Sequence, residues 1–327
     1  MVKKALILGA GGFIGSHMVD RLNEEGFFTV GMDLKYPEFN KSNCDEFYLA
    51  DLTEKEHIEK VLSSKNKFGE IYQYAADMGG AGFIFTGDND ADIMHNSSMI
   101  NLNLLRSVVK NYKKDSPKIF YSSSACIYPE EIQETPENKG LKESDAYPAN
   151  PDSEYGWEKL FSERLYLSYL KNYGLDVKVA RFHNIYGPKG TWNGGREKAP
   201  AAICRKVAEV KDGEEIEIWG DGEQTRSFLF IDDCIEATRR LMNSNVNTPI
   251  NIGSEEMISI NNLVKLVSSI GNKSISIKHI DGPLGVRGRN SENSMIREKL
   301  NWDYEFKLKD GIEITYKWIV EQIENLN

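Results

Sequence analysis

Short hydrophobic runs alternate with longer amphipathic stretches along the first 182 residues of the chain. The runs occupy residues 5–9, 29–33, 46–52, 70–76, 118–124 and 176–182. Most of the stretches between them have the length and the hydrophobic spacing expected of helices. Strands that alternate with helices predict a parallel sheet covered by helices on both faces. We therefore expect an α/β fold built on a doubly wound, Rossmann-type sheet.

The pattern changes at the end of the sixth run. Loops rich in glycine and proline then alternate with helices, and residues 249–253 resemble one more short strand that returns to the sheet. We predict that residues 1–182, joined by 228–256, form the domain that contains the sheet. Residues 183–227 and 257–327 are expected to form a smaller, discontinuous α+β lobe.

Composition and charge narrow the choice of partners. The 327 residues include 50 acidic and 40 basic side chains, which give a net charge of −10, and no run of Lys and Arg exceeds two residues. We therefore expect neither nucleic acid nor an anionic membrane surface as a partner. The hydrophobic runs are too short to span a membrane, and no hydrophobic signal segment follows the first residues, which predicts a cytoplasmic protein.

The cysteines and histidines do not form a metal-binding pattern. The four cysteines are scattered, without a CxxC pair or a disulfide framework, and the five histidines form no HExxH motif. We expect no metal site, and we expect Cys44, Cys204 and Cys234 to be structural.

The first loop carries the glycine spacing of a dinucleotide-binding turn. It reads Gly9-Ala10-Gly11-Gly12-Phe13-Ile14-Gly15 and lies between the first predicted strand and a predicted helix. Glycines allow the backbone to turn tightly and to approach a pyrophosphate, which the N-terminus of the next helix attracts. Asp33, at the end of the second run, can accept hydrogen bonds from ribose hydroxyls and would repel a 2′-phosphate. The cofactor is therefore expected to be NAD rather than NADP.

Tyr155 and Lys159 lie four residues apart in a predicted helix, and therefore on the same face of it. A phenol has a pKa of about 10, but a nearby ammonium group and a positive nicotinamide ring both stabilise the phenolate. Tyr155 could then take the proton of a sugar hydroxyl as the carbon loses hydride to NAD. The same spacing also occurs by chance on surface helices. Its position in a dinucleotide fold, after a strand that ends in Ser122-Ser123-Ser124, favours a catalytic role.

The third run ends near Asp51, which could meet the adenine of the cofactor together with Leu52. The alternative interpretation of Asp51 is a solvated or helix-capping aspartate. The predicted cofactor contacts are Gly9, Gly11, Gly12, Phe13, Ile14, Gly15, Asp33, Asp51, Leu52, Ala75, Tyr155 and Lys159.

Together these residues resemble the extended short-chain dehydrogenase/reductase family, which contains the nucleotide-sugar epimerases and dehydratases. The resemblance covers the chain from about Lys4 to Ile323. It is most specific in the strings AADMGGAGFI (75–84), SSACIYPE (123–130), LKESDAYPANP (141–151), RFHNIYGPKGTWNGGREKAPAAICRK (181–206), WGDGEQTRSF (219–228) and GPLGVRGRNS (282–291).

The resemblance implies epimerisation of GDP-D-mannose at C3 and C5 to GDP-L-galactose, with GDP-L-gulose as the 5-epimer. Tightly bound NAD would oxidise C4 transiently, with Ser124, Tyr155 and Lys159 at that carbon, and the resulting ketone would acidify the protons on C3 and C5. Cys126 and Lys198 match the family's pair that removes and returns those protons. Judged alone, Cys126 would be a buried small hydrophobe, and Lys198 a solvated charge or a phosphate contact.

The resemblance also implies a set of contacts to the GDP-hexose substrate. Arginine suits a diphosphate because its fork donates two hydrogen bonds at once, and Arg287 is an equal candidate to Arg289. Members of the family are commonly homodimers that pack through two helices of each subunit, and helices at about 92–113 and 152–173 would serve here. The implied substrate contacts are Gly79, Ser124, Ala125, Cys126, Asn184, Glu197, Lys198, Ala199, Lys206, Gln224, Thr225, Arg226 and Arg289.

Three alternatives stay open from the sequence. An enzyme like GDP-L-fucose synthase would pair its cysteine with a histidine and consume NADPH, whereas Lys198 takes that place here and Asp33 disfavours NADP. Another nucleotide-sugar epimerase would share Tyr155 and Lys159. A non-catalytic NAD-binding scaffold or sensor would be expected to have lost the Tyr-Lys pair, and both residues are present.

Overall fold

The computed structural model describes residues 2–63, 67–112 and 115–326. Its centre is a seven-stranded sheet, parallel throughout, with the strand order β11-β6-β5-β4-β1-β2-β3. The predicted doubly wound α/β fold is therefore confirmed. The strands are β1 (Lys4–Leu8), β2 (Phe28–Asp33), β3 (Glu46–Leu49), β4 (Glu70–Gln73), β5 (Lys118–Ser124), β6 (Val177–Phe182) and β11 (Ile250–Ile252).

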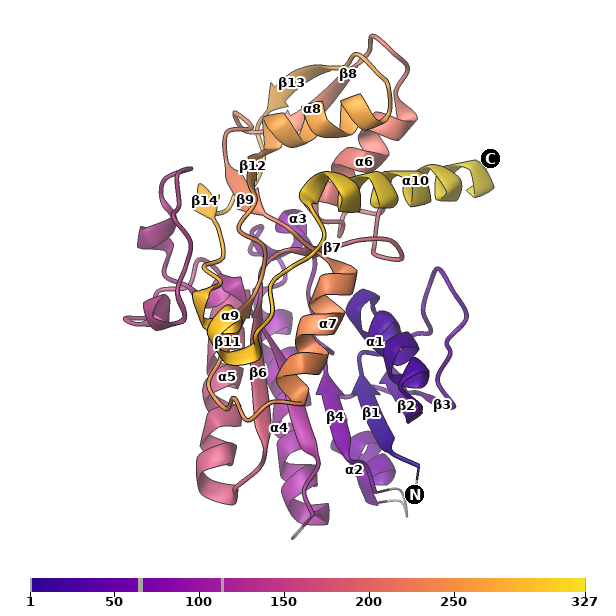
Figure 1. Ribbon diagram of the computed structural model, residues 1–327, viewed down its shortest axis with the longest axis vertical. Helices are drawn as coiled ribbons and strands as arrows, with labels where there is room; N and C mark the ends of the chain where they lie inside the picture. The colour runs from indigo at the N-terminus through magenta and orange to yellow at the C-terminus, as the bar shows by residue number, and fades with distance from the viewer. Residues whose placement is uncertain (1, 64–66, 113–114, 327) are drawn as a thin grey trace.

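Helices cover both faces of this sheet (Figure 1). On one face α1 (Phe13–Glu24) packs beside α7 (Ile231–Met242), and the other face carries α2 (Lys55–Ser63), α4 (Asp90–Asn111) and α5 (Glu154–Tyr173). The predicted end of the fourth helix, Lys113, lies outside the described residues.

The alternation of side chains along β1 explains the two layers. Ala5 and Ile7 belong to the hydrophobic core on one side of the sheet, while Leu6 and Leu8 belong to the core on the other, and all four are fully buried. A central parallel strand is buried on both faces, so every position of it is hydrophobic.

Two strands are shorter than their hydrophobic runs predict, because side chains turn the chain away from the sheet. The run 70–76 pairs only as far as Gln73, whose side-chain Oε1 accepts the N–H of Ala75 at 3.0 Å. The run 46–52 pairs only as far as Leu49, and Asp51 then accepts the N–H of Thr53 at 2.8 Å before α2 begins. The freed residues form loops at the carboxyl edge of the sheet, where a doubly wound fold binds its ligands.

The second half of the chain builds the part of the molecule above that edge (Figure 1). Three helices pack against one another there, and β9 lies between β12 and β14. The division into the two predicted domains stays a prediction. The elements are α3 (Ala81–Ile84), β7 (Ile185–Tyr186), α6 (Ala199–Glu209), β8 (Glu215–Trp219), β9 (Thr225–Ser227), β10 (Leu229–Phe230), β12 (Met257–Ser259), α8 (Ile260–Ile270), β13 (Ser276–Ile280), β14 (Gly288–Arg289), α9 (Ser294–Leu300) and α10 (Leu308–Leu326).

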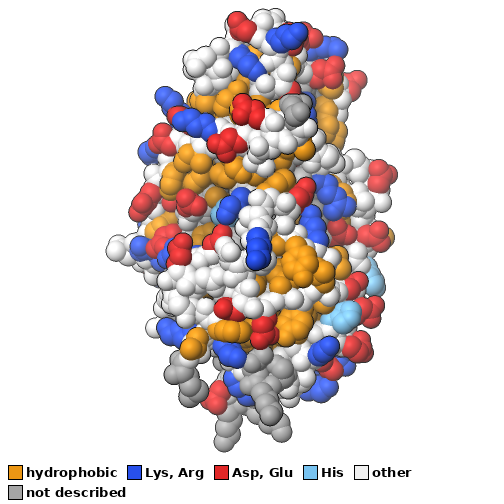
Figure 2. Space-filling model, turned by 90° about the vertical axis from the view of Figure 1, so that its right-hand side faces the viewer, with side chains coloured by type: hydrophobic (Ala, Val, Ile, Leu, Met, Phe, Trp, Pro, Cys, Tyr) orange, Lys and Arg blue, Asp and Glu red, His pale blue; other side chains and the backbone are white. Residues whose placement is uncertain are grey.

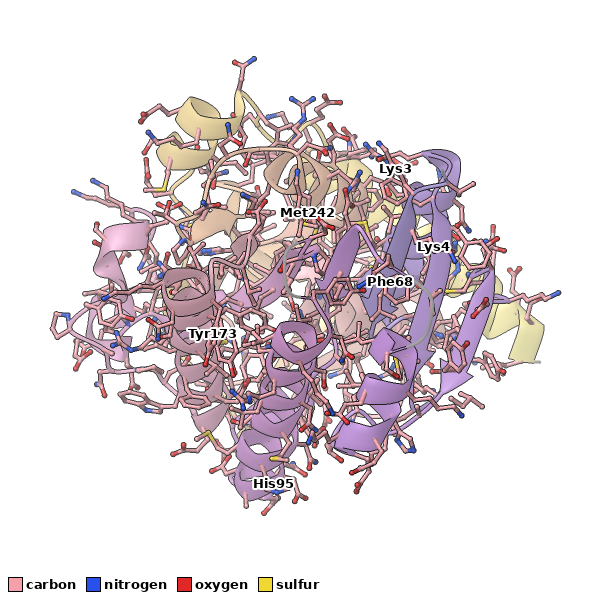
Figure 3. The ribbon with its side chains drawn as sticks, turned by 90° about the horizontal axis from the view of Figure 1, so that it is seen from below. Lys3, Lys4, Phe68, His95, Tyr173 and Met242 are labelled. Atoms are coloured by element: carbon pink, nitrogen blue, oxygen red, sulfur yellow. The ribbon has the colours of Figure 1, made fainter. Side chains whose placement is uncertain are left out.

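The surface is mixed in character. Figure 2 shows Lys and Arg interspersed with Asp and Glu, with hydrophobic patches between them, on the side where β3 forms the edge of the sheet. Figure 3 views the opposite end from the ligand-binding edge, and Lys4 and Phe68 lie there at the start of β1 and just before β4. None of the described helices combines the length and the hydrophobicity that crossing a lipid bilayer would require.

Candidate active site

The glycine-rich loop lies at the point where the strand order reverses, between β1 and β4. Gly9 follows β1 and has a φ of +85°, and a Cβ at this position would lie 2.7 Å from the backbone nitrogen of Ala75, which follows β4. Only glycine combines this left-handed conformation with so close an approach of two loops. The structure thus brings together Gly9 and Ala75, two of the predicted cofactor contacts.

Helix α1 begins immediately after this loop without a side-chain cap. Gly12 is the N-cap residue, and no side chain accepts a hydrogen bond from the first turn, which starts at Phe13. The predicted contacts Gly11, Gly12, Phe13, Ile14 and Gly15 therefore form the loop and the first turn of the helix. Uncapped N–H groups at a helix N-terminus form an anion site, and this one suits a pyrophosphate.

Asp33 is the last residue of β2, as the spacing predicts. Its Oδ2 accepts the N–H of Gly11 at 2.9 Å, which fixes the carboxylate beside the loop. Burial raises the pKa of Asp33, and the backbone hydrogen bonds from Gly11, Lys35 and Leu34 oppose that rise. The loop, the uncapped helix and this carboxylate together fit NAD.

Asp51 accepts hydrogen bonds inside the turn that precedes α2. Its Oδ1 accepts hydrogen bonds from the backbone N–H and the hydroxyl of Thr53 at 2.8 and 2.7 Å, just before α2, and Leu52 is buried in the core. The predicted contact of Asp51 and Leu52 with adenine stays a prediction.

Tyr155 and Lys159 lie in the first turns of α5. The Nζ of Lys159 donates to the carbonyl of Ser122 at 3.0 Å and lies 5.6 Å from the centroid of the Tyr155 ring. Burial raises the pKa of the Tyr155 phenol, Cys126 adds to the rise and the hydroxyl of Ser124 opposes it. Burial lowers the pKa of Lys159, and the nearby Glu158 opposes that change. The phenol, the ammonium group and the serine hydroxyl therefore form one buried cluster, as expected.

The start of α5 lies unusually close to the strand end that carries Cys126. Ser153 caps the helix by accepting the N–H of Gly156 at 3.3 Å. A Cβ on Gly156 would lie 2.8 Å from Cβ of Pro151 and 3.0 Å from the carbonyl carbon of Cys126. The absence of a side chain at Gly156 is thus what allows the helix bearing Tyr155 to rest against Cys126.

Cys126 belongs to a short 3₁₀ helix, η1 (Ala125–Ile127), that follows β5 directly. The Ser124 hydroxyl accepts the N–H of Cys126 at 3.1 Å, and the half-buried Cys126 side chain packs on a cluster that includes Tyr155. The Nη1 of Arg289 donates to the Cys126 Sγ at 3.1 Å. The thiol therefore lies beside Ser124 and Tyr155 and is in contact with the guanidinium of Arg289.

Lys198 is the N-cap residue of α6, and it is close enough to Cys126 to interact with it electrostatically. Burial lowers the pKa of Lys198, and its interaction with Cys126 opposes that change. The loop before Lys198 is held against the glycines before α3, since the N–H of Gly80 donates to the carbonyl of Arg196 at 3.0 Å. This contact places Gly79, a predicted sugar contact, beside the loop that carries Lys198.

The predicted substrate contacts in the upper part of the molecule differ in how many of their polar atoms already have hydrogen-bond partners in the protein. The buried Oε1 of Gln224 has no hydrogen-bond partner among the described residues. Arg226 donates to the carbonyls of Thr225, Leu284 and Val286, and burial lowers its pKa to about 9. The remaining predicted contacts, each with protein partners or at an element boundary, are Asn184, Glu197, Ala199, Lys206 and Thr225.

Arg289 is 4% exposed, and its guanidinium is occupied on three sides. Besides Cys126, it donates to Gln133 Oε1 and to Asp152 Oδ2, both at 2.7 Å. Arg287, the equal candidate, lies at the surface and forms an ion pair with Asp221 at 2.9 Å. The contact of Arg289 or of Arg287 with substrate stays a prediction.

Gln133 and Asp152 belong to this site although the sequence did not single them out. Neither forms part of a recognisable motif with Arg289, which lies 156 and 137 residues away. The one feature of the sequence that could have indicated Asp152 is its position immediately before Ser153, the N-cap of α5.

Comparisons with known proteins identify the family of the chain. A model of the NAD dependent epimerase/dehydratase family matches residues 5–253. The chain is 50% identical over 323 residues to GDP-mannose 3,5-epimerase of Arabidopsis thaliana, covering 98% of this chain and 83% of that protein.

Two solved structures share the fold over nearly the whole chain. UDP-glucose 4-epimerase of Thermotoga maritima, with UDP-glucose, has a TM-score of 0.86 and 26% identity, covering 98% of this chain and 99% of that chain. UDP-glucuronic acid 4-epimerase of Bacillus cereus, in complex with UDP-glucuronic acid and NAD, has a TM-score of 0.81 and 27% identity over the same shares of the two chains.

Proposed function

Because the chain belongs to the NAD-dependent epimerase/dehydratase family, we propose that it is an epimerase that inverts C3 and C5 of GDP-D-mannose to give GDP-L-galactose. The glycine loop, the start of α1 and Asp33 would hold NAD, which would supply the hydride acceptor for C4 of the hexose. The observation that carries the proposal is that Cys126 packs against Tyr155 and interacts electrostatically with both Lys159 and Lys198.

The three residues of that cluster act at the C4 oxygen. Tyr155 takes the proton of the C4 hydroxyl, and the charge of Lys159, held on the Ser122 carbonyl, stabilises the phenolate that results. The Ser124 hydroxyl binds the same oxygen. On the return step Tyr155 gives the proton back, so this group ends each cycle as it began.

Cys126 and Lys198 act at the two neighbouring carbons. A ketone at C4 acidifies the protons on C3 and C5, and inversion requires one group to remove a proton from one face and another to deliver one to the opposite face. The lowered pKa of Lys198 brings its neutral form closer to neutral pH. Inversion at C5 alone would give GDP-L-gulose as the side product.

The upper part of the molecule is proposed to bind the GDP group. The Oε1 of Gln224, which has no partner among the described residues, can accept a hydrogen bond from the base or ribose. Arg287 can exchange its surface ion pair for a phosphate. Arg226 and Lys206 would add positive charge on the same side.

Incubation with GDP-mannose in D2O, read by NMR and mass spectrometry, tests the proposal. Deuterium is expected at both C3 and C5 without added cofactor. Cys126→Ala is expected to abolish the exchange while bound NAD is retained, and Cys44→Ala, at the other half-buried cysteine, serves as the matched control. Exchange into another nucleotide sugar but not into GDP-mannose would overturn the substrate assignment.

A homodimer is proposed through the outer faces of α4 and α5. The two helices lie side by side, with His95 on one and Tyr173 on the other (Figure 3). Trp157, Phe161 and Tyr173 of α5 remain 39%, 47% and 51% exposed, which is unusual for three aromatic side chains of one helix. Phe161→Asp is expected to give a monomer in analytical ultracentrifugation. Tyr36→Asp, which changes a comparably exposed aromatic side chain between β2 and β3, should leave the dimer intact. Unchanged sedimentation of Phe161→Asp would reject this interface.

A cytoplasmic location is proposed as well, because a thiol that exchanges protons must stay reduced. Cell fractionation tests it, and recovery of the protein from an oxidising compartment would reject it.

A further inference from the structure

The contact between Arg289 and Cys126 is the only hydrogen bond to the Cys126 sulfur among the described residues. Five ionisable side chains interact electrostatically with Cys126, from four different parts of the chain: Tyr155 and Lys159 of α5, Lys198 before α6, Arg226 of β9 and Arg289 of β14. Of these, Arg289 alone has a nitrogen placed on Sγ, at 3.1 Å.

Two side chains other than Cys126 hold the guanidinium of Arg289 in position. Gln133 accepts from Nε and Asp152 from Nη2, each at 2.7 Å, which leaves Nη1 directed at Cys126. Both partners and Arg289 itself are buried, so the arrangement is shielded from water. An arginine fork held at two points loses little conformational freedom when it makes its third contact.

Asp152 ties this arrangement to the helix that carries Tyr155. Its Oδ1 accepts the hydroxyl of Ser153 at 3.1 Å, and Ser153 is the N-cap of α5. The chain of contacts therefore runs from α5 through Asp152 and Arg289 to the thiol. A displacement of α5 would therefore move Arg289, and a displacement of Arg289 would move the start of α5.

We infer that Arg289 is a positioning residue of the proposed reaction, which holds the Cys126 sulfur in place and stabilises the thiolate that remains when Cys126 gives its proton to the sugar carbon. The inference rests on the role proposed for Cys126. In the thiol state the charges of Arg289 and Asp152 balance each other, and in the thiolate state the guanidinium is shared between two anions. The proton that Cys126 gives up is regained when it removes one in another step, so no other reagent is consumed.

The charge state of Arg289 supports this role. Burial acts to lower its pKa, but the interactions with Cys126 and Asp152 outweigh burial and raise the pKa above the ordinary value of arginine. The guanidinium is therefore charged at neutral pH.

The pH profile of Cys126 alkylation tests the inference without any sugar substrate. Iodoacetamide reacts with thiolates, and mass spectrometry of peptides separates Cys126 from Cys44, a half-buried cysteine that serves as an internal reference. In Arg289→Gln we expect the half-maximal pH for Cys126 to rise by about one unit, a tenfold change in thiolate at a given pH, while that of Cys44 stays constant. The midpoint, unlike the rate, does not depend on how accessible the sulfur becomes.

Two further variants separate the role from simple structural support. Arg289→Lys keeps the charge but loses the fork, and it is expected to keep a midpoint between those of the wild type and of Arg289→Gln. Arg297→Gln, which breaks an arginine network in α9, is expected to leave the Cys126 midpoint unchanged. An unshifted Cys126 midpoint in both Arg289 variants would overturn the inference, whichever sugar the enzyme uses. Failure of deuterium exchange in the wild type would instead reject the proposed function and leave the alkylation result standing.

Discussion

Gly156→Ala tests how closely α5 must approach the thiol. The added Cβ would clash with the carbonyl oxygen of Cys126 and would lie 3.0 Å from its carbonyl carbon, whereas two carbon atoms prefer a separation of about 3.5–4.0 Å. The helix and η1 must therefore separate by roughly 1 Å. Overpacking of this kind costs about 1–3 kcal/mol, from which the better helix propensity of alanine recovers about 0.5–1 kcal/mol. We expect a net loss of roughly 1–2 kcal/mol in the free energy of unfolding.

The effect on chemistry should be larger than the effect on stability. A displacement of about 1 Å between reacting groups can cost about 100-fold in rate, and here it would separate Tyr155 from Cys126. Urea unfolding gives the stability, and deuterium incorporation into GDP-mannose gives the rate. Gly69→Ala is the matched control, because its Cβ would have no neighbour closer than 3.9 Å. Deuterium incorporation at the wild-type rate in Gly156→Ala would refute the argument that this contact positions the two residues.

Three other variants probe the cofactor end, the oxidation step and the core. Asp33→Asn removes the negative charge that the ribose hydroxyls would contact, so less NAD should stay bound to the protein through gel filtration. The bound NAD is measured as the nucleotide released on denaturation, and full retention would contradict this prediction. Tyr155→Phe keeps the ring but cannot move the C4 proton, so deuterium incorporation should fall by at least about 100-fold with little change in urea midpoint, and residual exchange near the wild-type rate would remove Tyr155 from the step. His183 is buried beside Asn251, and burial lowers its pKa to about 3. The unfolded chain, with a histidine pKa of about 6.5, therefore binds the proton first, so the stability contributed by neutral His183 is complete above about pH 6.5 and is lost at up to about 1.4 kcal/mol per unit as the pH falls towards 3. Urea midpoints across this range should decline less steeply for His183→Asn, and equal slopes would contradict the assignment.

The features that sequence predicted well are those determined by neighbouring residues. The glycine loop, its following helix and Asp33 occupy one continuous βαβ segment, so their spacing alone fixed their relation. The same holds for Tyr155 and Lys159, which are one turn apart on α5. The ends of β3 and β4 were less predictable, because side-chain bonds from Asp51 and Gln73 compete with the strand ladder.

The part of the site that sequence could not predict depends on contacts between distant segments. Arg289 and Cys126 are separated by 163 residues, and the β14 segment is held between β9 and the chain around Gln133. The resemblance to the family implied that Arg289 contacts the substrate, and the chemistry of arginine suited a diphosphate. Nothing in the local pattern indicates that Gln133 and Asp152 already occupy its fork.

The position of β14 near the C-terminal end of the chain has a consequence for synthesis. A nascent chain emerges from its N-terminus and folds in that order. The glycine loop, Cys126 and Tyr155 are all made long before Arg289, so an incomplete chain could hold a nucleotide while its thiol still lacked the guanidinium partner. The guanidinium contact would therefore be among the last parts of the site to form, after the loop, the thiol and the phenol are already in place.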